Sequence, residues 1–152
     1  MSGIETEFLF QARLEVPRIN DLGATPFGHR RIAEVSGGTF EGPKLKGRAL
    51  PGGGDWLLLR NDGVLQLDVR LILETDDKAL IYMTYRGARH GPDAVMQRLN
   101  AGEPVDPSEY YFRTAPFFET SSEKYAWLNG IVSVATGHRT PEGPVYDVYQ
   151  VL

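Results

Sequence analysis

The chain of 152 residues carries 16 Lys plus Arg against 20 Asp plus Glu, a formal net charge of −4, and contains no cysteine. An acidic balance excludes a phosphate backbone as an expected partner, so we expect no nucleic acid. The lack of cysteine excludes a disulfide framework, a thiolate nucleophile and a sulfur-ligated metal, and it fits a cytoplasmic protein.

The length predicts one domain, 1–152, because no serine-rich or charged tract divides the chain. The longest apolar runs, such as 56–59, are far too short for a membrane helix, and the N-terminus lacks an export-signal pattern, so we expect no membrane association. The 17 glycines and 10 prolines lie between short apolar runs, which is typical of an all-β protein with many turns.

Alternating apolar and polar residues predict a first strand over 8–16, which Pro17 ends. We then expect a loop over 19–26 and a second strand over 28–35. A strand over 39–50 is interrupted by glycine and proline, because proline cannot donate to a central ladder.

Asn61-Asp62-Gly63 between the apolar runs 56–60 and 64–75 predicts a β-hairpin. In the second arm, alternate leucines and a valine form one face, while Asp68 and Arg70 lie on the other. The sequence leaves open which face lines the interior. Further strands are predicted over 80–86, 110–120, 127–137 and 145–151.

The segment 94–99 is flanked by helix start and stop signals, with Pro92 and Asp93 before it and Gly102 after it. We expect this to be the one real helix and to cover a barrel mouth, with a further helical turn over 121–126. The predicted fold is therefore a closed or nearly closed antiparallel β-barrel with one short helix, with a β-sandwich as the alternative.

Several motifs together are specific, namely Gly38-Thr-Phe-Glu-Gly-Pro-Lys-Leu-Lys-Gly47, Gly53-Gly-Asp-Trp56, Leu67-Asp-Val-Arg70, Tyr85-Arg-Gly87, Tyr111-Phe-Arg-Thr114 and Tyr125-Ala-Trp-Leu-Asn129. On these motifs nearly the whole chain resembles the bacterial and fungal family catalogued as domain of unknown function three-two-three-seven. The resemblance implies a calycin-like or allene-oxide-cyclase-like barrel that self-associates, and it implies no settled reaction. We expect a homo-oligomer, with a homodimer as the simplest form. Lys78 departs from the glycine expected in its turn.

Asp68 and Arg70 lie two residues apart in a predicted strand and so project from the same face. If that face lines the lumen, Arg70 binds a carboxylate or polarises a carbonyl, and Asp68 orients it or acts as general base. The alternative is a solvated surface pair.

Asp55 and Trp56 follow three glycines, so a tight turn can present both side chains at a barrel rim. There Asp55 is a candidate base, because burial beside an aromatic ring raises the pKa of a carboxyl group. The alternative is a turn aspartate and a core tryptophan.

Tyr85 is the fourth candidate catalytic residue, as a donor to an oxyanion. Most aromatic side chains are expected to fill the barrel. The candidate substrate-binding residues are Trp56, Tyr82, Arg86, Phe112, Tyr125, Trp127 and Asn129. The three histidines lack metal-ligand spacing, so neither a metal nor another cofactor is expected.

These residues favour a cofactor-independent isomerase, cyclase or hydratase-like lyase. A small carbonyl or aromatic ligand would bind in the lumen, where Asp55 or Asp68 moves a proton while Arg70 and Tyr85 stabilise an oxyanion. The alternatives are a non-catalytic ligand-binding barrel and a homo-oligomeric interaction module.

Overall fold

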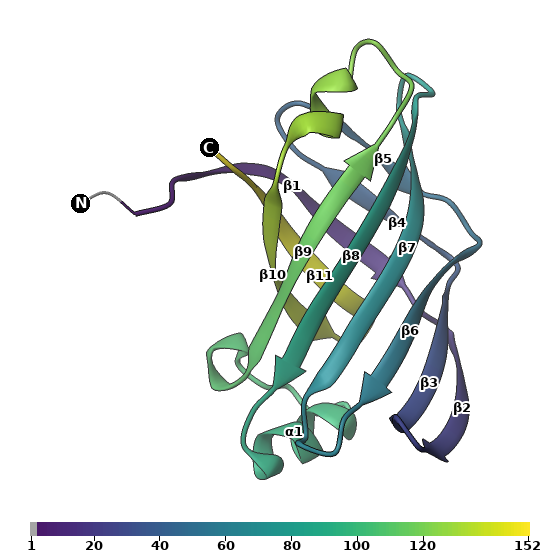
Figure 1. The fold of residues 1–152 in the computed structure, drawn as a ribbon, viewed down its shortest axis with the longest axis vertical. Coiled ribbons are helices and arrows are strands. Elements are labelled where there is room, and N and C mark those ends of the chain that lie inside the picture. Colours follow the sequence, from purple (N-terminus) through teal and green to yellow (C-terminus); the bar gives the residue numbers. More distant parts are fainter. Residues whose placement is uncertain (1–2) are drawn as a thin grey trace.

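A computed structural model describes residues 3–152, so residues 1 and 2 of the predicted domain 1–152 lie outside the described part. Within residues 3–152, the strands form one 11-stranded sheet beside one α-helix and two short 3-10 helices (Figure 1). The ladders of this sheet are antiparallel, so the antiparallel β-barrel predicted from the sequence is confirmed.

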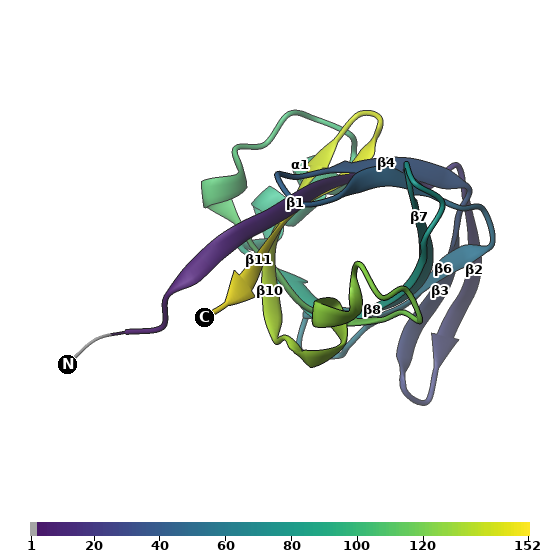
Figure 2. The ribbon, with the colours of Figure 1, turned by 90° about the horizontal axis from the view of Figure 1, so that it is seen from above.

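A ring of strands closes the barrel, as the view along its axis shows (Figure 2). Each strand pairs with the next, and the last strand pairs back with the first. In ring order they are β7 (Leu65–Thr75), β5 (Lys46–Ala49), β4 (Gly37–Glu41), β1 (Thr6–Glu15), β11 (Gly143–Val151), β10 (Ser133–Thr140), β9 (Tyr111–Glu119) and β8 (Leu80–His90). Closure removes the free edges that an open sheet would leave.

A wing of three strands branches from β7: β6 (Gly53–Leu59), β3 (Gly28–Val35) and β2 (Arg18–Thr25). The C-terminal part of β7 pairs with β5, whereas its N-terminal half pairs with β6. The wing therefore extends the barrel wall at one end of the molecule (Figure 1).

Two expectations for the N-terminal third are wrong. The expected loop over 19–26 is the strand β2, which pairs with β3 alone and has mostly exposed side chains, so no buried face imposes an apolar alternation on it. The single interrupted strand expected over 39–50 is the hairpin of β4 and β5. The strand expected over 28–35 is confirmed as β3.

The leucine face of β7 fills the barrel. Its inward side chains are buried, and they are Leu65, Leu67, Val69, Leu71 and Leu73. They pack against inward residues of the neighbouring strands, such as Ile81 and Met83 of β8, in one continuous core. The question left open by the sequence is thereby answered: the other face of β7, with Asp68 and Arg70, is the outside of the barrel.

The α-helix α1 (Asp93–Asn100) covers the lower end of the barrel in Figure 1, as predicted. It follows Pro92, and its buried residues are Val95 and Leu99. Gly102 beyond its end has a φ of 78°, a left-handed conformation that glycine adopts without strain. Among residues 3–152, no helix has the length and apolar character needed to cross a membrane.

The opposite end of the barrel carries the 3-10 helix η2 (Ala126–Gly130). The strand expected over 127–137 is wrong in its first part, because β10 begins only at Ser133. The Asn129 side chain instead fixes the preceding loop: its Oδ1 accepts from Thr120 N at 2.8 Å and its Nδ2 donates to Thr120 O at 2.9 Å. The helical turn expected over 121–126 lies later in the chain, as η2.

The predicted hairpin at Asn61-Asp62-Gly63 is confirmed between β6 and β7, and Gly63 has a φ of 87°. Lys78, in the turn between β7 and β8, has a φ of 72°. It is the one non-glycine residue with positive φ among residues 3–152. A side chain in this conformation costs roughly 1–2 kcal/mol, a cost that the glycine expected here from the family resemblance would avoid.

Candidate functional site

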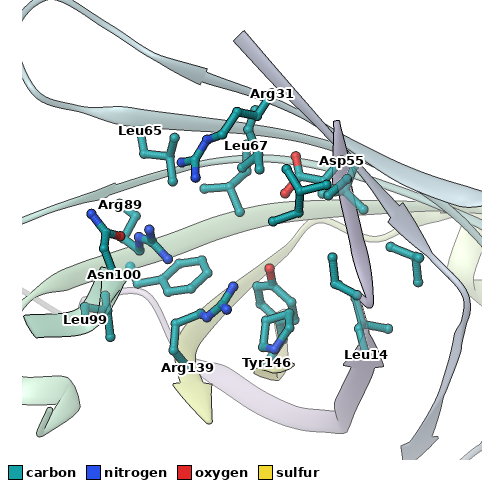
Figure 3. A pocket seen from close by; sticks show the side chains of 18 of the residues that line it. Leu14, Arg31, Asp55, Leu65, Leu67, Arg89, Leu99, Asn100, Arg139 and Tyr146 are labelled. Carbon is teal, nitrogen blue, oxygen red and sulfur yellow. The ribbon is translucent and has the colours of Figure 1, made fainter. Parts of the chain in front are cut away.

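A cavity of about 360 Å³ lies in the lumen at the end where α1 and the wing meet (Figure 3). One part of its wall is apolar and is formed by Leu14, Leu57, Leu65, Leu67, Val69 and Phe112. The polar part consists of Arg31, Asp55, Tyr85, Arg89, Asn100, Arg139 and Tyr146. Among the residues that the structure describes, Asp55 is the only carboxylate in this wall.

Asp55 faces the cavity from β6 and is only 9% exposed. Its Oδ1 accepts a hydrogen bond from the backbone N–H of Asp68 at 3.1 Å. The β6–β7 ladder is interrupted at this point, because residues 54 and 55 pair with β7, residues 56 and 57 do not, and pairing resumes at residue 58. At this gap the Asp68 N–H donates to the Asp55 side chain instead of to a backbone carbonyl of β6. This hydrogen bond fixes the Asp55 carboxyl group at the cavity wall.

Burial raises the pKa of Asp55 to about 6. The negative charge of Asp68 also raises this pKa, whereas the hydrogen bond from Asp68 N and the positive charges of Arg89 and Arg31 lower it. Burial has the largest effect and decides the direction. A carboxyl group with such a pKa is ionised at neutral pH and is a stronger base than an ordinary aspartate. It can take a proton from a bound ligand and return it.

Two tyrosine hydroxyl groups are buried near Asp55. The rings of Tyr85 and Tyr146 lie with centroids 5.1 Å apart, and Phe112 packs edge-on against Tyr146 at 5.5 Å. Burial raises the pKa of both tyrosines, so both hydroxyls stay protonated at neutral pH. The Tyr85 hydroxyl makes no hydrogen bond of normal geometry among residues 3–152, and its nearest interaction is with the Tyr146 hydroxyl, so it can turn to donate to a ligand oxygen.

Three arginines reach the cavity from β3, β8 and β10: Arg31, Arg89 and Arg139. Arg89 lies 5.8 Å from the centroid of the Phe112 ring, and its buried Nε has no hydrogen-bond partner within the described chain. Burial and the charge of Arg139 lower the pKa of Arg89 to about 10, so it remains charged at neutral pH.

The structure brings three of the predicted site residues together in this cavity, namely Asp55, Tyr85 and Phe112. Asp68 and Arg70 lie on the outer face of β7, because strand parity turns them away from the buried leucines. They do not share the cavity with Asp55.

The outer face of the barrel also carries three predicted substrate-binding residues. Trp56 is 39% exposed, and the Arg70 guanidinium lies 5.7 Å from the centroid of its ring. Tyr82 and Arg86 project outward from β8, alternating with the buried Ile81, Met83 and Tyr85. We interpret these side chains as a surface cluster, since their parity directs them to solvent.

The last three predicted residues lie at the η2 end of the barrel, away from Asp55. The Tyr125 hydroxyl donates to Asp77 Oδ1 at 2.9 Å, and Asn129 bonds the backbone of Thr120. Lys44 Nζ lies 5.3 Å from the centroid of the Trp127 ring. These contacts fasten the loop that covers this end.

The sequence reasoning missed Arg31, Arg89 and Arg139, and it assigned Tyr146 to the core. The sequence could have indicated Arg89, because it lies four residues after Tyr85 and so on the same face of the strand. It was missed because the predicted strand ended at residue 86, whereas β8 continues to His90. For Arg31 and Arg139 the neighbouring residues gave no apolar pattern from which a facing cavity could be inferred.

The part of the chain that the structure describes contains no group of three or more His, Asp or Glu side chains that could hold a metal ion. The polar groups that line the cavity are one carboxylate, two phenolic hydroxyls, one carboxamide and three guanidinium groups.

A closed antiparallel barrel with a buried carboxylate in the wall of an internal cavity defines a class, the small β-barrels with an internal cavity. Within this class, residues 4–151 match the family described as "Protein of unknown function (DUF3237)", and the chain belongs to that family. The resemblance stated from the sequence motifs is thereby confirmed.

Individual relatives agree with this assignment. A UPF0311 protein of Bradyrhizobium diazoefficiens is 38% identical over 149 residues, which cover 98% of this chain and 97% of that protein. A β-barrel-like protein from Acinetobacter baumannii, known from a crystal structure, is 41% identical with a TM-score of 0.86, covering 100% of this chain and 98% of that one. The hydroalkoxylation enzyme phnH of Penicillium herquei is 27% identical over 146 residues, 95% of this chain and 82% of that protein.

Proposed function

We propose that this protein is a cofactor-independent isomerase, cyclase or hydratase-like lyase that acts on a small carbonyl or aromatic compound by acid/base chemistry. The observation that carries the proposal is the buried Asp55 carboxyl group, which faces the cavity with a pKa raised to about 6. Perturbed carboxyl groups in cavities are typical of proton-transfer sites.

In the proposed reaction, Asp55 takes a proton from an acidic C–H or O–H group of the ligand. The electron pair left behind is delocalised onto a ligand oxygen, which accepts a hydrogen bond from the Tyr85 hydroxyl. The proton then passes from Asp55 to a carbon of the same ligand. Return to a different carbon gives an isomer, and addition of the deprotonated oxygen to a double bond before protonation gives a cyclic ether.

The name of the Penicillium herquei relative supports this reaction class. Hydroalkoxylation is the addition of an alcohol O–H across a carbon–carbon double bond, in which the oxygen loses a proton and a carbon gains one; a single acid/base group can carry out both transfers. The relative is described as a hydroalkoxylation enzyme. In this chain Asp55 is suited to both steps, because a pKa of about 6 lets it change protonation state near neutral pH.

The test uses proton exchange, so that the natural substrate need not be known. A panel of small aryl ketones, together with 2′-hydroxychalcone as a ring-closing probe, is incubated with the protein in D₂O. Loss of the C–H signal next to the carbonyl, and formation of the cyclic product, are followed by NMR. We expect the wild type to accelerate exchange of at least one compound over the buffer rate and Asp55→Asn to abolish the acceleration.

Asp68→Asn is the matched control, since it removes a carboxylate close in sequence but on the outer face of the barrel. It should keep most of the wild-type rate, because the Asp68 charge contributes less than burial to the raised pKa of Asp55. Equal rates in the wild type and in Asp55→Asn would contradict the assignment of the base. Binding of panel compounds without any accelerated exchange would favour the alternative, a non-catalytic ligand-binding barrel.

We also propose that the protein acts in the cytoplasm as a homodimer. The absence of cysteine supports the location, which cell fractionation can test. Self-association is supported by exposed apolar side chains on the outer face of β9 and β10, namely Tyr111, Phe117 and Val134.

A further inference from the structure

The charges in the cavity wall do not balance. Arg31, Arg89 and Arg139 face a single carboxylate, Asp55. Within residues 3–152, the ion pairs involve other residues, and none joins a carboxylate to one of these three arginines. Arg31 and Arg89 are half-buried, whereas Arg139 is exposed at the end of β10. A half-buried guanidinium group without an acidic partner is costly, and a bound anion removes this cost.

Arg89 is the most confined of the three. Its guanidinium group is held near the Phe112 ring, and its buried Nε has no hydrogen-bond partner among the described residues. The group is therefore oriented by packing, and part of its donor capacity is unused. A planar guanidinium with free donors matches the two oxygens of a carboxylate.

A second recess of about 380 Å³ lies between α1 and the turn that joins β6 to β7. It shares Arg31, Leu65, Arg89 and Asn100 with the cavity that contains Asp55. The two arginines thus stand where the two hollows meet. In Figure 3, Arg89 and Asn100 lie on the side of the cavity away from Asp55.

We propose that the ligand carries a carboxylate that binds Arg31 and Arg89 at this junction, while its opposite end reaches Asp55. The inference rests on the proposed function, because it takes the cavity as the reaction site. The recess beyond the arginines is lined by Asp62, which is paired with Arg60, and by Asp93, so the ligand carboxylate is placed at Arg31 and Arg89 themselves and not deeper in the recess. Repulsion from Asp55 keeps it away from the opposite end, and the apolar wall at Leu67 and Phe112 contacts the body of the ligand. The ligand class is a small aromatic or unsaturated carboxylic acid, and its charge sets its orientation.

The first test compares a carboxylate with a neutral compound of the same shape. 3-(4-Hydroxyphenyl)propanoate and its amide are titrated into the protein by calorimetry at pH 7.5. We expect the acid to bind about tenfold or more tightly than the amide, as charge-assisted bonds to arginine predict. Arg89→Met should remove this preference and leave the affinity for the amide unchanged, whereas Arg70→Met, on the outer face, should leave both affinities unchanged.

A second measurement needs no variant and so does not depend on Arg89→Met folding correctly. The pKa of Asp55 is followed by carboxyl-carbon NMR with saturating acid or amide. A bound carboxylate adds a negative charge to the cavity and should raise the pKa of Asp55 further, and the amide should leave it unchanged. Equal affinities for acid and amide, or a pKa that does not respond to the acid, would overturn the inference.

The variant Asp55→Asn separates this inference from the proposed function. It should bind the acid as tightly as the wild type or more tightly, because a like charge is removed, while proton exchange is lost. Loss of exchange without any acid preference would leave the proposed function standing and refute the carboxylate site. An Arg89-dependent acid preference with exchange intact in Asp55→Asn would support the carboxylate site and refute the proposed base.

Competition with inorganic phosphate shows whether an anion without an organic body is enough for binding. If phosphate displaced the acid fully at equal concentration, the result would contradict a site that is specific for a carboxylic acid.

Discussion

Asp55 lies where its negative charge reduces the stability of the folded protein. Its pKa is raised from 3.8 to about 6, so between these pH values the folded protein retains a proton that the unfolded chain has lost. The protonated form of Asp55 therefore favours the folded state relative to the charged form. This favourable contribution is fully present below pH 3.8 and is lost as the pH rises through 6.

We expect Asp55→Asn to raise the free energy of unfolding by about 1–3 kcal/mol at pH 8 and to change it little at pH 4. The amide oxygen of asparagine can still accept the hydrogen bond from Asp68 N, so the loss of charge is the main change. Urea denaturation at the two pH values measures this difference. A variant that is destabilised equally at both would show that Asp55 is not held in a desolvated site.

Tyr85 gives a second prediction at the scale of one residue. Its hydroxyl is buried, makes no hydrogen bond of normal geometry within residues 3–152 and interacts only with the Tyr146 hydroxyl. We expect Tyr85→Phe to leave stability unchanged or to raise it by up to about 1 kcal/mol, because no well-aligned protein hydrogen bond is lost. Proton exchange on the aryl ketones should slow in the same variant. Marked destabilisation in thermal unfolding would mean that the hydroxyl has a structural role.

At the scale of elements, the loop before η2 is fastened to the turn after β7. The Tyr125 hydroxyl donates to Asp77 Oδ1 at 2.9 Å, and Lys124 Nζ lies 2.8 Å from Asp77 Oδ2. Tyr125 is itself 5% exposed, so its ring packs in the core beneath this contact.

Tyr125→Phe should therefore lower the free energy of unfolding by about 1–2 kcal/mol, through loss of one hydrogen bond to a charged acceptor. This is the opposite of the effect expected for Tyr85→Phe, although both changes delete one buried tyrosine hydroxyl. Because the contact lies at the η2 end, ligand affinity in the cavity should not change. A neutral effect on stability, measured by urea denaturation, would contradict the role given to Asp77.

The elements that could be predicted are those with strong local sequence patterns. The Asp62-Gly63 turn, the alternation along β7 and the proline and glycine around α1 each act within a few residues, and all three gave correct elements. The strand β2 pairs on one side only and buries little, so nothing in its sequence distinguishes it from a loop.

The site was harder to predict than the strands because it depends on which face of a strand turns inward. Asp68 and Arg70 have the spacing of a functional pair, yet the buried Val69 between them and the buried leucines on either side fix their face as the outside. Arg31, Arg89 and Arg139 come from β3, β8 and β10, which only the closure of the barrel brings together. No spacing along the chain encodes that approach.

At the scale of the whole molecule, the two ends of the barrel differ. One end is covered by η2, while at the other the wing and α1 extend the wall around the cavity (Figure 1). The outer surface of β9 and β10 lies on the side of the sheet away from the cavity, and it exposes Phe117 and Val134.

If this surface forms the proposed homodimer, light scattering after size exclusion should give twice the 16.9 kDa mass of one chain. Phe117→Glu should give monomers, because a charge in an apolar interface is not solvated. Its cavity should still bind ligand. A wild-type protein that is monomeric at all concentrations would contradict the dimer.

The central claim is that the Asp55 carboxyl group is desolvated in an otherwise basic cavity and acts there as the base. The measurement that tests it most directly is a pH titration of the free protein by carboxyl-carbon NMR, with Asp55→Asn used to assign the signal. We predict a midpoint of about 6 for Asp55. A midpoint near the ordinary value of 3.8 would show that water reaches this carboxyl group freely and would contradict its assignment as the base.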